Sequence, residues 1–389
     1  MRLALLLLLL AACKDKPPHY RHDAAVAQPA KDAAVAPDAG VWPETAKLPV
    51  ISPLRVISLP AKLDAPRFTI GGPVLLGDLA VVSSSQFGFA AVDFRRGQLV
   101  WVKPAGSHVA PPLVVDGNLV LVGSCINPPT IPDGEELLGC IRVVTPTGSD
   151  QAYVAIRGRN VAAFQASAGE QIVWSAKGAV LWKRGDKVVS IDLLTGVAKP
   201  APDEGPPLVV TYKDKTWNVR RTEDGEISAT GKPSWKTESS YTALIGAVNY
   251  PGLTPLVRVV RAGRFRGNPE ILLFDMDATG SLQGQVSLSP APGIGIIGHA
   301  ISKVGNTALA VRLDTSLQRD YIAGYAANAA LQWIYPLPQT PRPDPVGLAL
   351  THDAVVVFHD GDTVTVLPEL SAPPTAPGAI RDPLENATP

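Results

Sequence analysis

The chain has 389 residues, and its 35 lysines and arginines are balanced by 35 aspartates and glutamates, which gives a formal net charge of zero. This balance, with aromatic residues at only 6%, leaves no basic surface of the kind that binds nucleic acid. The 38 prolines argue against long helices, while the length is ample for a large hydrophobic core.

The chain begins with a short apolar segment that ends in a cysteine. Residues 3–13 read LALLLLLLAAC and follow Arg2, which is the order of basic, apolar and small residues in a secretory signal peptide. An apolar run of about ten residues is too short to cross a bilayer, which takes roughly 20. The ending Leu10-Ala11-Ala12-Cys13 resembles the lipobox of bacterial lipoproteins. That resemblance implies a signal peptide over residues 1–12 and a lipid on Cys13; an ordinary secretory signal with an incidental cysteine is the alternative.

Two segments lack the large apolar side chains that a folded core needs. Residues 13–48 are rich in Ala, Pro and Asp and carry the run DAAVA twice, at Asp23 and at Asp32. Residues 371–389 have the same character. Such composition predicts disorder, so we expect a lipid-anchored tether over 13–48, a folded domain over 49–370 and a disordered tail.

The domain over 49–370 has the pattern of an all-β fold. Short runs of Val, Leu and Ile alternate with Gly, Asp, Asn and Pro, and four hairpins turn at residues 77–78, 116–118, 305–306 and 352–353. The first two turns lie about 40 residues apart and the last two about 47, which predicts a β-propeller of four-stranded antiparallel blades. One hairpin per blade, near residues 77, 117, 169, 214, 252, 305 and 352, gives seven blades, with six or eight as alternatives. Residues 55–59 are expected to close the ring against residues 363–366.

A second repeated element indicates the kind of blade. The sequence AVDFRRGQLVW runs over residues 91–101, and looser versions begin at Ala162, Ser190, Leu273 and Gly324. This element resembles the PQQ-like propeller repeat, in which a strand of the form small-apolar-Asp turns through Thr-Gly into a strand that ends in Trp. The resemblance weakens over residues 202–241. The versions at Ala162 and Ser190 lie too close together to belong to separate blades.

Two cysteines remain once Cys13 is assigned to the anchor. Cys125 and Cys140 are close in sequence in an exported chain, which favours a disulfide; a metal or redox pair would need CxxC spacing or nearby histidines. The segment between them interrupts the second blade, so we expect a protruding loop that contacts a protein partner. Its apolar residues are the expected contacts: Ile126, Ile131, Leu137 and Leu138. The acids Asp133, Glu135 and Glu136 are expected to be solvated.

Three further motifs match binding sites only in part. Residues 293–298 read GIGIIG, with Asp314 beyond them, but no strand and helix flank them as a dinucleotide site requires, so a glycine-rich crossing between blades is expected. Residues 275–280 begin like a calcium loop, yet Val286 stands where the loop's glutamate belongs. His352, His359, Asp360 and Asp362 could together suggest a metal site. The two histidines should, however, lie at opposite ends of one strand, so a single ion cannot bind both.

The sequence therefore predicts no catalytic, cofactor-binding or metal site. It has no GxSxG, HExxH, CxxCH or Walker A motif, and it lacks the adjacent cysteines of quinoprotein dehydrogenases. A lipobox joined to PQQ-like blades is similar to the propeller lipoprotein of the outer-membrane β-barrel assembly machinery. That similarity implies a non-enzymatic scaffold, anchored in the bacterial cell envelope and facing the periplasm or the cell surface, that binds a protein partner such as a component of β-barrel assembly. Lys14 after the cysteine fits outer-membrane sorting, and we expect the propeller to be monomeric.

The alternative is a ligand-binding or catalytic propeller that acts on polysaccharide or cell-wall material. It would gather acids or aromatic side chains at one mouth of the central channel, whereas a scaffold would leave the channel plain and carry an apolar patch on a rim.

Overall fold

The computed structural model describes most of the predicted folded domain. It covers residues 51–370 apart from residues 61–70, 86, 107–108, 170, 177–178, 214, 223, 232–233, 238–240, 250–253, 266–267, 278, 291–293, 303, 314–319, 328–330, 339–345 and 369. The predicted signal peptide, Cys13, the tether and the tail lie outside the described residues.

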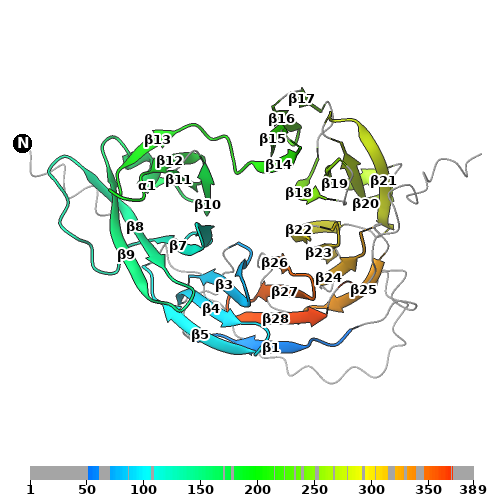
Figure 1. Ribbon diagram of the computed structural model, residues 1–389, viewed down its shortest axis with the longest axis horizontal. Helices are drawn as coiled ribbons and strands as arrows, with labels where there is room; N and C mark the ends of the chain where they lie inside the picture. The colour runs from blue at the N-terminus through cyan, green and yellow to red at the C-terminus, as the bar shows by residue number, and fades with distance from the viewer. Residues whose placement is uncertain are drawn as a thin grey trace, which may run out of the picture. The chain divides into compact units, whose positions relative to one another are not determined.

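The described chain forms seven four-stranded antiparallel sheets arranged as the blades of a β-propeller (Figure 1). Blades 1 and 2 consist of β2 (Val74–Leu76), β3 (Leu79–Ser84), β4 (Gly88–Asp93) and β5 (Gln98–Lys103), then β6 (Leu113–Val115), β7 (Asn118–Gly123), β8 (Glu136–Val144) and β9 (Asp150–Gly158). Blades 3 and 4 consist of β10 (Gln171–Ala176), β11 (Ala179–Arg184), β12 (Lys187–Ile191) and β13 (Ala198–Ala201), then β14 (Leu208–Tyr212), β15 (Lys215–Arg221), β16 (Ile227–Thr230) and β17 (Trp235–Lys236). Blades 5 and 6 consist of β18 (Ala243–Val248), β19 (Leu256–Phe265), β20 (Asn268–Met276) and β21 (Leu282–Pro290), then β22 (Ile294–Ile301), β23 (Thr307–Leu313), β24 (Asp320–Tyr325) and β25 (Leu331–Pro336). Blade 7 consists of β26 (Gly347–Leu350), β27 (Ala354–His359), β28 (Thr363–Pro368) and β1 (Arg55–Ser58).

Blade 7 closes the ring by joining the two ends of the folded chain. Strand β1 pairs antiparallel with β28, and its first and last residues lie opposite Val366 and Thr363. The prediction that residues 55–59 pair with residues 363–366 is therefore confirmed, as is the seven-bladed count. Pairing the ends covers two strand edges that would otherwise invite association with other chains.

Turn residues with positive φ set the tight hairpins. Asp116 and Gly117 join β6 to β7 with φ of 48° and 75°, the left-handed conformation that a two-residue hairpin turn requires at both positions. Gly77 plays the corresponding part between β2 and β3, with φ of 60°.

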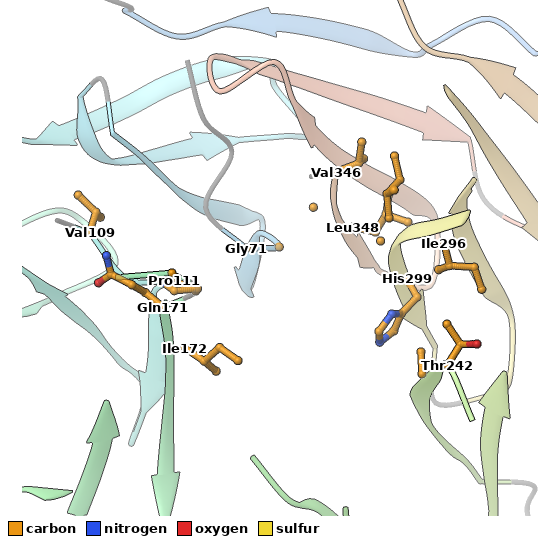
Figure 2. Close-up of a pocket in the computed structure, with 16 residues that line it drawn as sticks. Gly71, Val109, Pro111, Gln171, Ile172, Thr242, Ile296, His299, Val346 and Leu348 are labelled. Atoms are coloured by element: carbon orange, nitrogen blue, oxygen red, sulfur yellow. The ribbon is translucent and has the colours of Figure 1, made fainter. Parts of the chain in front are cut away.

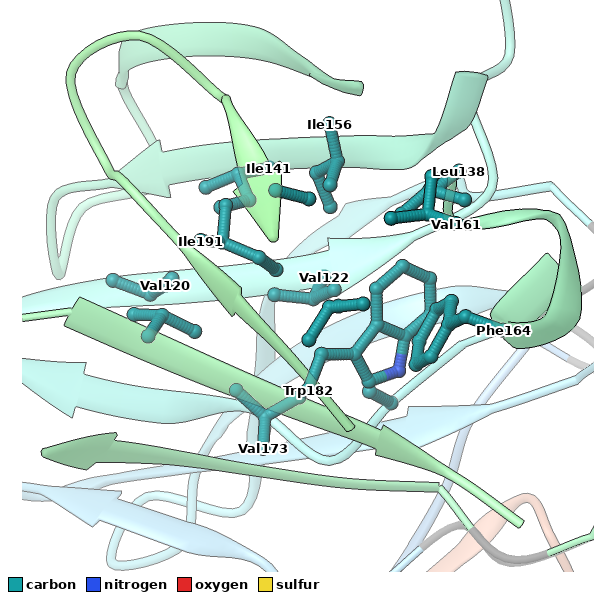
Figure 3. Packing of buried hydrophobic residues seen from close by; sticks show 14 residues of the cluster. Val120, Val122, Leu138, Ile141, Ile156, Val161, Phe164, Val173, Trp182 and Ile191 are labelled. Atoms are coloured by element: carbon teal, nitrogen blue, oxygen red, sulfur yellow. The ribbon is translucent and has the colours of Figure 1, made fainter. Parts of the chain in front are cut away.

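Apolar clusters between neighbouring blades form the core. Figure 3 shows the cluster between blades 2 and 3, in which the buried indole of Trp182 stands edge-on to Phe164 with ring centroids 4.9 Å apart. Phe164 lies on α1 (Ala162–Ala166), a one-turn helix between these two blades. Similar clusters join blades 1 and 2, 4 and 5, 5 and 6, 6 and 7, and 7 and 1.

The structure corrects the assignment of residues 162–174 as a blade repeat. Its first part is α1 and its last part is β10, the inner strand of blade 3, so the hairpin of that blade turns after Ala176 instead of near residue 169. The version at Ser190 is the true repeat, because β12 and β13 pair there.

Candidate functional site

The inner strands surround a cavity of about 940 Å³ (Figure 2). Its walls come from the inner strands, and the residues just before them, of blades 1, 2, 3, 5, 6 and 7. The lining is mainly apolar or glycine: Gly71, Gly72, Val109, Pro111, Gly169, Gln171, Ile172, Thr242, Ala243, Ile296, Ile297, Gly298, His299, Val346, Gly347 and Leu348. Within the part of the chain that the structure describes, no Asp, Glu, Lys, Arg, Phe, Tyr or Trp side chain lines this cavity.

Three side chains bring polarity to the cavity. Figure 2 shows Gln171 and His299 on opposite sides of it, with Thr242 beside His299. Burial lowers the pKa of His299 below its usual value, and a hydrogen bond with the backbone of Leu244 partly opposes that shift. The imidazole is therefore neutral at pH 7, and the described lining offers it no carboxylate partner. This set can accept and donate hydrogen bonds but lacks the paired acids that glycoside hydrolysis uses.

Glycines allow the inner strands of blades 6, 7 and 1 to approach very closely. A Cβ at Gly298 would lie 2.1 Å from the carbonyl oxygen of Val346, and one at Gly347 would lie 2.5 Å from that of Gly71. The predicted crossing over residues 293–298 is thus wrong: Gly295 and Gly298 lie within β22, the inner strand of blade 6, and Gly293 and Asp314 fall outside the described residues. Gly298 and Gly347 are therefore needed because the backbones of neighbouring blades come into direct contact at these positions.

The disulfide lies on the rim of blade 2. Cys125 and Cys140 are joined with an S–S distance of 2.06 Å, so the segment after β7 is tied to β8. Beside it lies a shallow hollow whose lining includes Phe89, Pro104, Ile126 and Tyr153.

Two exposed side chains and one half-buried side chain surround this hollow, and we name them the disulfide rim: Ile126 and Tyr153, which are exposed, and Arg142, which is half-buried. Ile126 and Tyr153 are each 43% exposed, and the backbone N–H of Ile126 lies 3.4 Å from the Tyr153 hydroxyl, which accepts a hydrogen bond from it. The guanidinium of Arg142 stacks on the Tyr153 ring, 5.1 Å from its centroid. Tyrosine and arginine are among the residue types that are enriched at the energetic centres of protein interfaces.

The four predicted contacts do not share one environment. Ile126 is exposed, while Ile131 and Leu137 are half-buried. Leu137 and Leu138 lie in β8, and Leu138 is only 6% exposed because it packs in the cluster between blades 2 and 3. Leu138 is therefore a core residue, and its assignment as a partner contact is wrong. Tyr153 and Arg142 were missed because they lie on β9 and β8, outside the loop's sequence limits.

The acids of the loop have local structural partners. Glu135 forms an ion pair with Arg157 of β9, and Glu136 accepts a hydrogen bond from the backbone N–H of Val161 at 3.1 Å. Asp133 is exposed. Two of the three acids thus fasten β8 and its loop to neighbouring segments, which corrects the expectation that all three are merely solvated.

The remaining motifs are also explained by local structure. Asp275 is buried and paired with Arg258. Asp277 accepts hydrogen bonds from the backbone N–H groups of Thr279 and Ser281, at 2.8 and 3.1 Å, and so shapes the turn between β20 and β21. His352 and His359 lie just before and at the end of β27, as expected, and His359 contacts Asp360 and Thr365.

Two general features of the described residues bear on function. They contain no group of three or more His, Cys, Asp or Glu side chains placed to hold a metal ion. Among the same residues, no helix has the length and apolar character needed to cross a membrane.

Comparison with known proteins gives structural similarity alone. No family model and no curated protein matches the chain. A chain of the mitotic checkpoint complex aligns over 84% of this chain and 98% of its own, at 11% identity and a TM-score of 0.46. BamB from Moraxella catarrhalis aligns over 77% of this chain and 84% of its own, at 13% identity and a TM-score of 0.37. The quinohemoprotein alcohol dehydrogenase from Comamonas testosteroni aligns over 81% of this chain and 69% of its own, at 10% identity and a TM-score of 0.39.

Proposed function

We propose that this protein is a lipid-anchored scaffold of the bacterial cell envelope, whose propeller binds a protein partner through the disulfide rim. The observation that carries the proposal is the contrast between two surfaces. The described lining of the central cavity has no Asp, Glu, Lys, Arg, Phe, Tyr or Trp side chain, whereas the disulfide rim exposes Ile126 and Tyr153 with Arg142 stacked against the Tyr153 ring.

The position of the disulfide rim supports a binding role. The disulfide fastens the loop to β8, and the Glu135–Arg157 ion pair adds a second attachment to β9. A surface held in this way loses little conformational entropy when a partner binds, which favours affinity. In the proposed role the lipid on Cys13 holds the propeller at the outer membrane, and the partner is a component of β-barrel assembly, as the sequence resemblance implies.

Site-specific photo-crosslinking in cells tests the partner surface. A photoreactive phenylalanine analogue is placed at Ile126 or Tyr153, and at Leu282 or Val56 as controls of similar exposure on blades 5 and 7. The proposal expects one discrete crosslinked species from both rim positions and none of that size from the controls. Equal crosslinking at all four positions, or none at the rim, would contradict it.

Changing Cys13→Ala tests the anchor separately. The variant should lose labelling by a palmitate analogue and move from the membrane fraction to the soluble fraction, because acyl chains provide about 0.8 kcal/mol of membrane affinity per buried CH₂. Retention of the variant in membranes washed without detergent would overturn the anchoring proposal. Purified propeller could still bind its partner in that case, so the two tests are independent.

A further inference from the structure

Two arginines are buried among the residues that the structure describes, and they differ in how their charge is balanced. Arg258 is fully buried and pairs with Asp275 at 2.8 Å. Arg184, at the end of β11 in blade 3, is only 9% exposed, yet no described residue gives it an ion pair or a hydrogen bond. Burial lowers the pKa of Arg184 below its usual value, but a guanidinium remains charged at pH 7. A buried charge without a partner is costly, so we expect Arg184 to meet an anion that the described chain does not supply.

A second polar side chain with an unused hydrogen-bonding atom lies beside Arg184. Gln171 of β10 is the cross-strand partner of Arg184, so both side chains stand on the same face of blade 3, with their Cβ atoms about 5 Å apart. That face is turned toward blade 2, because Val173 and Trp182, the next pair on the same face, pack in the cluster between blades 2 and 3. The Oε1 atom of Gln171 is buried and accepts no hydrogen bond from the described residues.

A lysine on the other side of Arg184 makes this position more positive. Lys187 of β12 lies opposite Arg184 in the sheet, and like charges that stand directly opposite each other are unfavourable. Lys187 is itself exposed and pairs with Asp186 at 3.0 Å. Two cations therefore share one exposed carboxylate, and an anion bound beside Arg184 would remove the repulsion between them.

Gln171 connects this polar row to the central cavity. It lines the cavity on the same side as Val109 and Pro111, and the neighbouring Ile172 points into the cavity (Figure 2). Arg184 is not part of the lining and lies one strand further from the cavity. Neighbouring strands are only about 4.8 Å apart, so the guanidinium is within reach of a group that a ligand places at Gln171. The cavity thus combines a mainly apolar lining with a cation behind one of its walls.

We propose that the central cavity binds a long-chain monocarboxylic acid, with its apolar chain in the cavity and its carboxylate on Arg184. The planar guanidinium can hold a carboxylate through two parallel N–H···O bonds, and one carboxylate matches the one cation that lacks a partner. The cavity volume of about 940 Å³ lies within the range of small-molecule sites, roughly 300–1,000 Å³. This site is separate from the disulfide rim, so the inference does not depend on the proposed function.

Calorimetric titration of the native protein with three probes tests both parts of the ligand. Dodecanoate should bind saturably, with one molecule per chain. Dodecanol has the same chain without the charge, and it should bind about tenfold more weakly or worse, because it forms no charge-assisted hydrogen bonds. Acetate has the charge without the chain and should show no binding at the same concentrations. Equal affinity for dodecanoate and dodecanol, or no saturable binding of dodecanoate, would overturn the proposal.

The variant Arg184→Met removes the charge and keeps an apolar stem in its place. It should weaken dodecanoate binding by about 10- to 100-fold and leave dodecanol binding unchanged. The ligand-free variant should also unfold at a higher urea concentration than the native protein, because it no longer buries an unpaired charge. A lower urea midpoint, or an equal loss of dodecanol binding, would mean that Arg184 is structural and would contradict the proposal. The comparison of probes on the native protein stands even if this variant does not fold.

Two further variants provide the controls. Arg220 is half-buried and pairs with Glu204 in blade 4, whose described residues do not line the cavity, so Arg220→Met should leave dodecanoate binding unchanged. A loss equal to that of Arg184→Met would mean that any buried positive charge has the same effect. Ile172→Trp narrows the cavity and should weaken dodecanoate and dodecanol together. Unchanged binding of both probes by Ile172→Trp would refute the placement of the chain in the cavity.

Discussion

The indole of Trp101 lies directly against Gly148 of the next blade. Trp101, on the outer strand β5 of blade 1, donates a hydrogen bond from Nε1 to the carbonyl of Pro146 at 3.1 Å. A Cβ at Gly148 would lie 2.6 Å from Cδ1 of that indole. Trp235 of blade 4 stands in the same relation to Gly280 of blade 5. The Trp and the Gly of the repeat therefore meet across a blade junction, which explains why the two residue types recur together.

Adding a methyl group at this contact should destabilise the protein. Gly148 has φ of 87° and Gly117 has φ of 75°, but nothing lies within 4 Å of a Cβ at Gly117. Gly148→Ala should therefore reduce the free energy of unfolding by about 1–3 kcal/mol more than Gly117→Ala does, because only the first also overpacks a neighbour. Urea denaturation of both variants measures the difference. Equal losses would mean that the indole moves aside freely.

A buried ion pair joins blades 5 and 6. Arg258 is fully buried and donates from Nε and Nη2 to the two carboxylate oxygens of Asp275, at 2.8 and 2.9 Å. It also donates to Thr307 Oγ1 and to the carbonyl of Ala327 in blade 6, both at 3.0 Å. The guanidinium thus satisfies groups on both sides of the junction.

Removing this guanidinium should cost much of the stability of the junction. Arg258→Met leaves the carboxylate of Asp275 buried without its partner, and it should reduce the free energy of unfolding by about 3–5 kcal/mol. Arg258→Met/Asp275→Leu should recover part of that loss, because no unpaired charge remains. Calorimetry or urea denaturation provides the comparison, and a double variant less stable than the single one would contradict this account.

Truncating two apolar residues of the Cys125–Cys140 segment should affect the stability of the protein to very different extents. Leu138→Ala creates a cavity between blades 2 and 3 and should reduce the free energy of unfolding by about 2–5 kcal/mol. Ile126→Ala removes an exposed side chain and should change it by less than about 0.5 kcal/mol. Denaturant midpoints of both variants measure the two changes in the free energy of unfolding. A large loss of stability from Ile126→Ala would show that this residue of the disulfide rim is structural.

The seven-bladed ring could be predicted from the sequence because the repeats show both the spacing of the hairpins and their turn residues. It was weakest over residues 202–241, which form blade 4, and the structure gives the reason. In β14 the exposed residues Val209 and Thr211 alternate with residues that are buried or half-buried, whereas five of the six residues of β3 are buried. That alternation was readable in residues 208–212, and it marks a blade with one face exposed to solvent, which sequence reasoning missed.

Local sequence motifs could not predict which residues from different strands pair with one another. Asp275 stood in a stretch that began like a calcium loop, but its partner Arg258 lies opposite it on the neighbouring strand β19. The one-turn helix α1 was overlooked because five residues carry too little periodicity. The disulfide rim likewise combines a loop residue with side chains from two strands, which only the register of β8 and β9 brings together.

The neutral His299 should make stability depend on pH. Because burial lowers its pKa in the folded state, the unfolded chain binds a proton more readily, and stability is lost as pH falls through the unfolded value of about 6.5. His299→Gln should remove this part of the loss while keeping a hydrogen-bond donor near Leu244. Denaturant midpoints of the native protein and this variant, measured between about pH 7.5 and about pH 5.5, should therefore converge or cross toward acid pH. His352→Gln is the matched control, since His352 is 82% exposed, and its midpoints should run parallel to those of the native protein. Parallel curves for His299→Gln as well would show that this imidazole is protonated equally in the folded and unfolded chain.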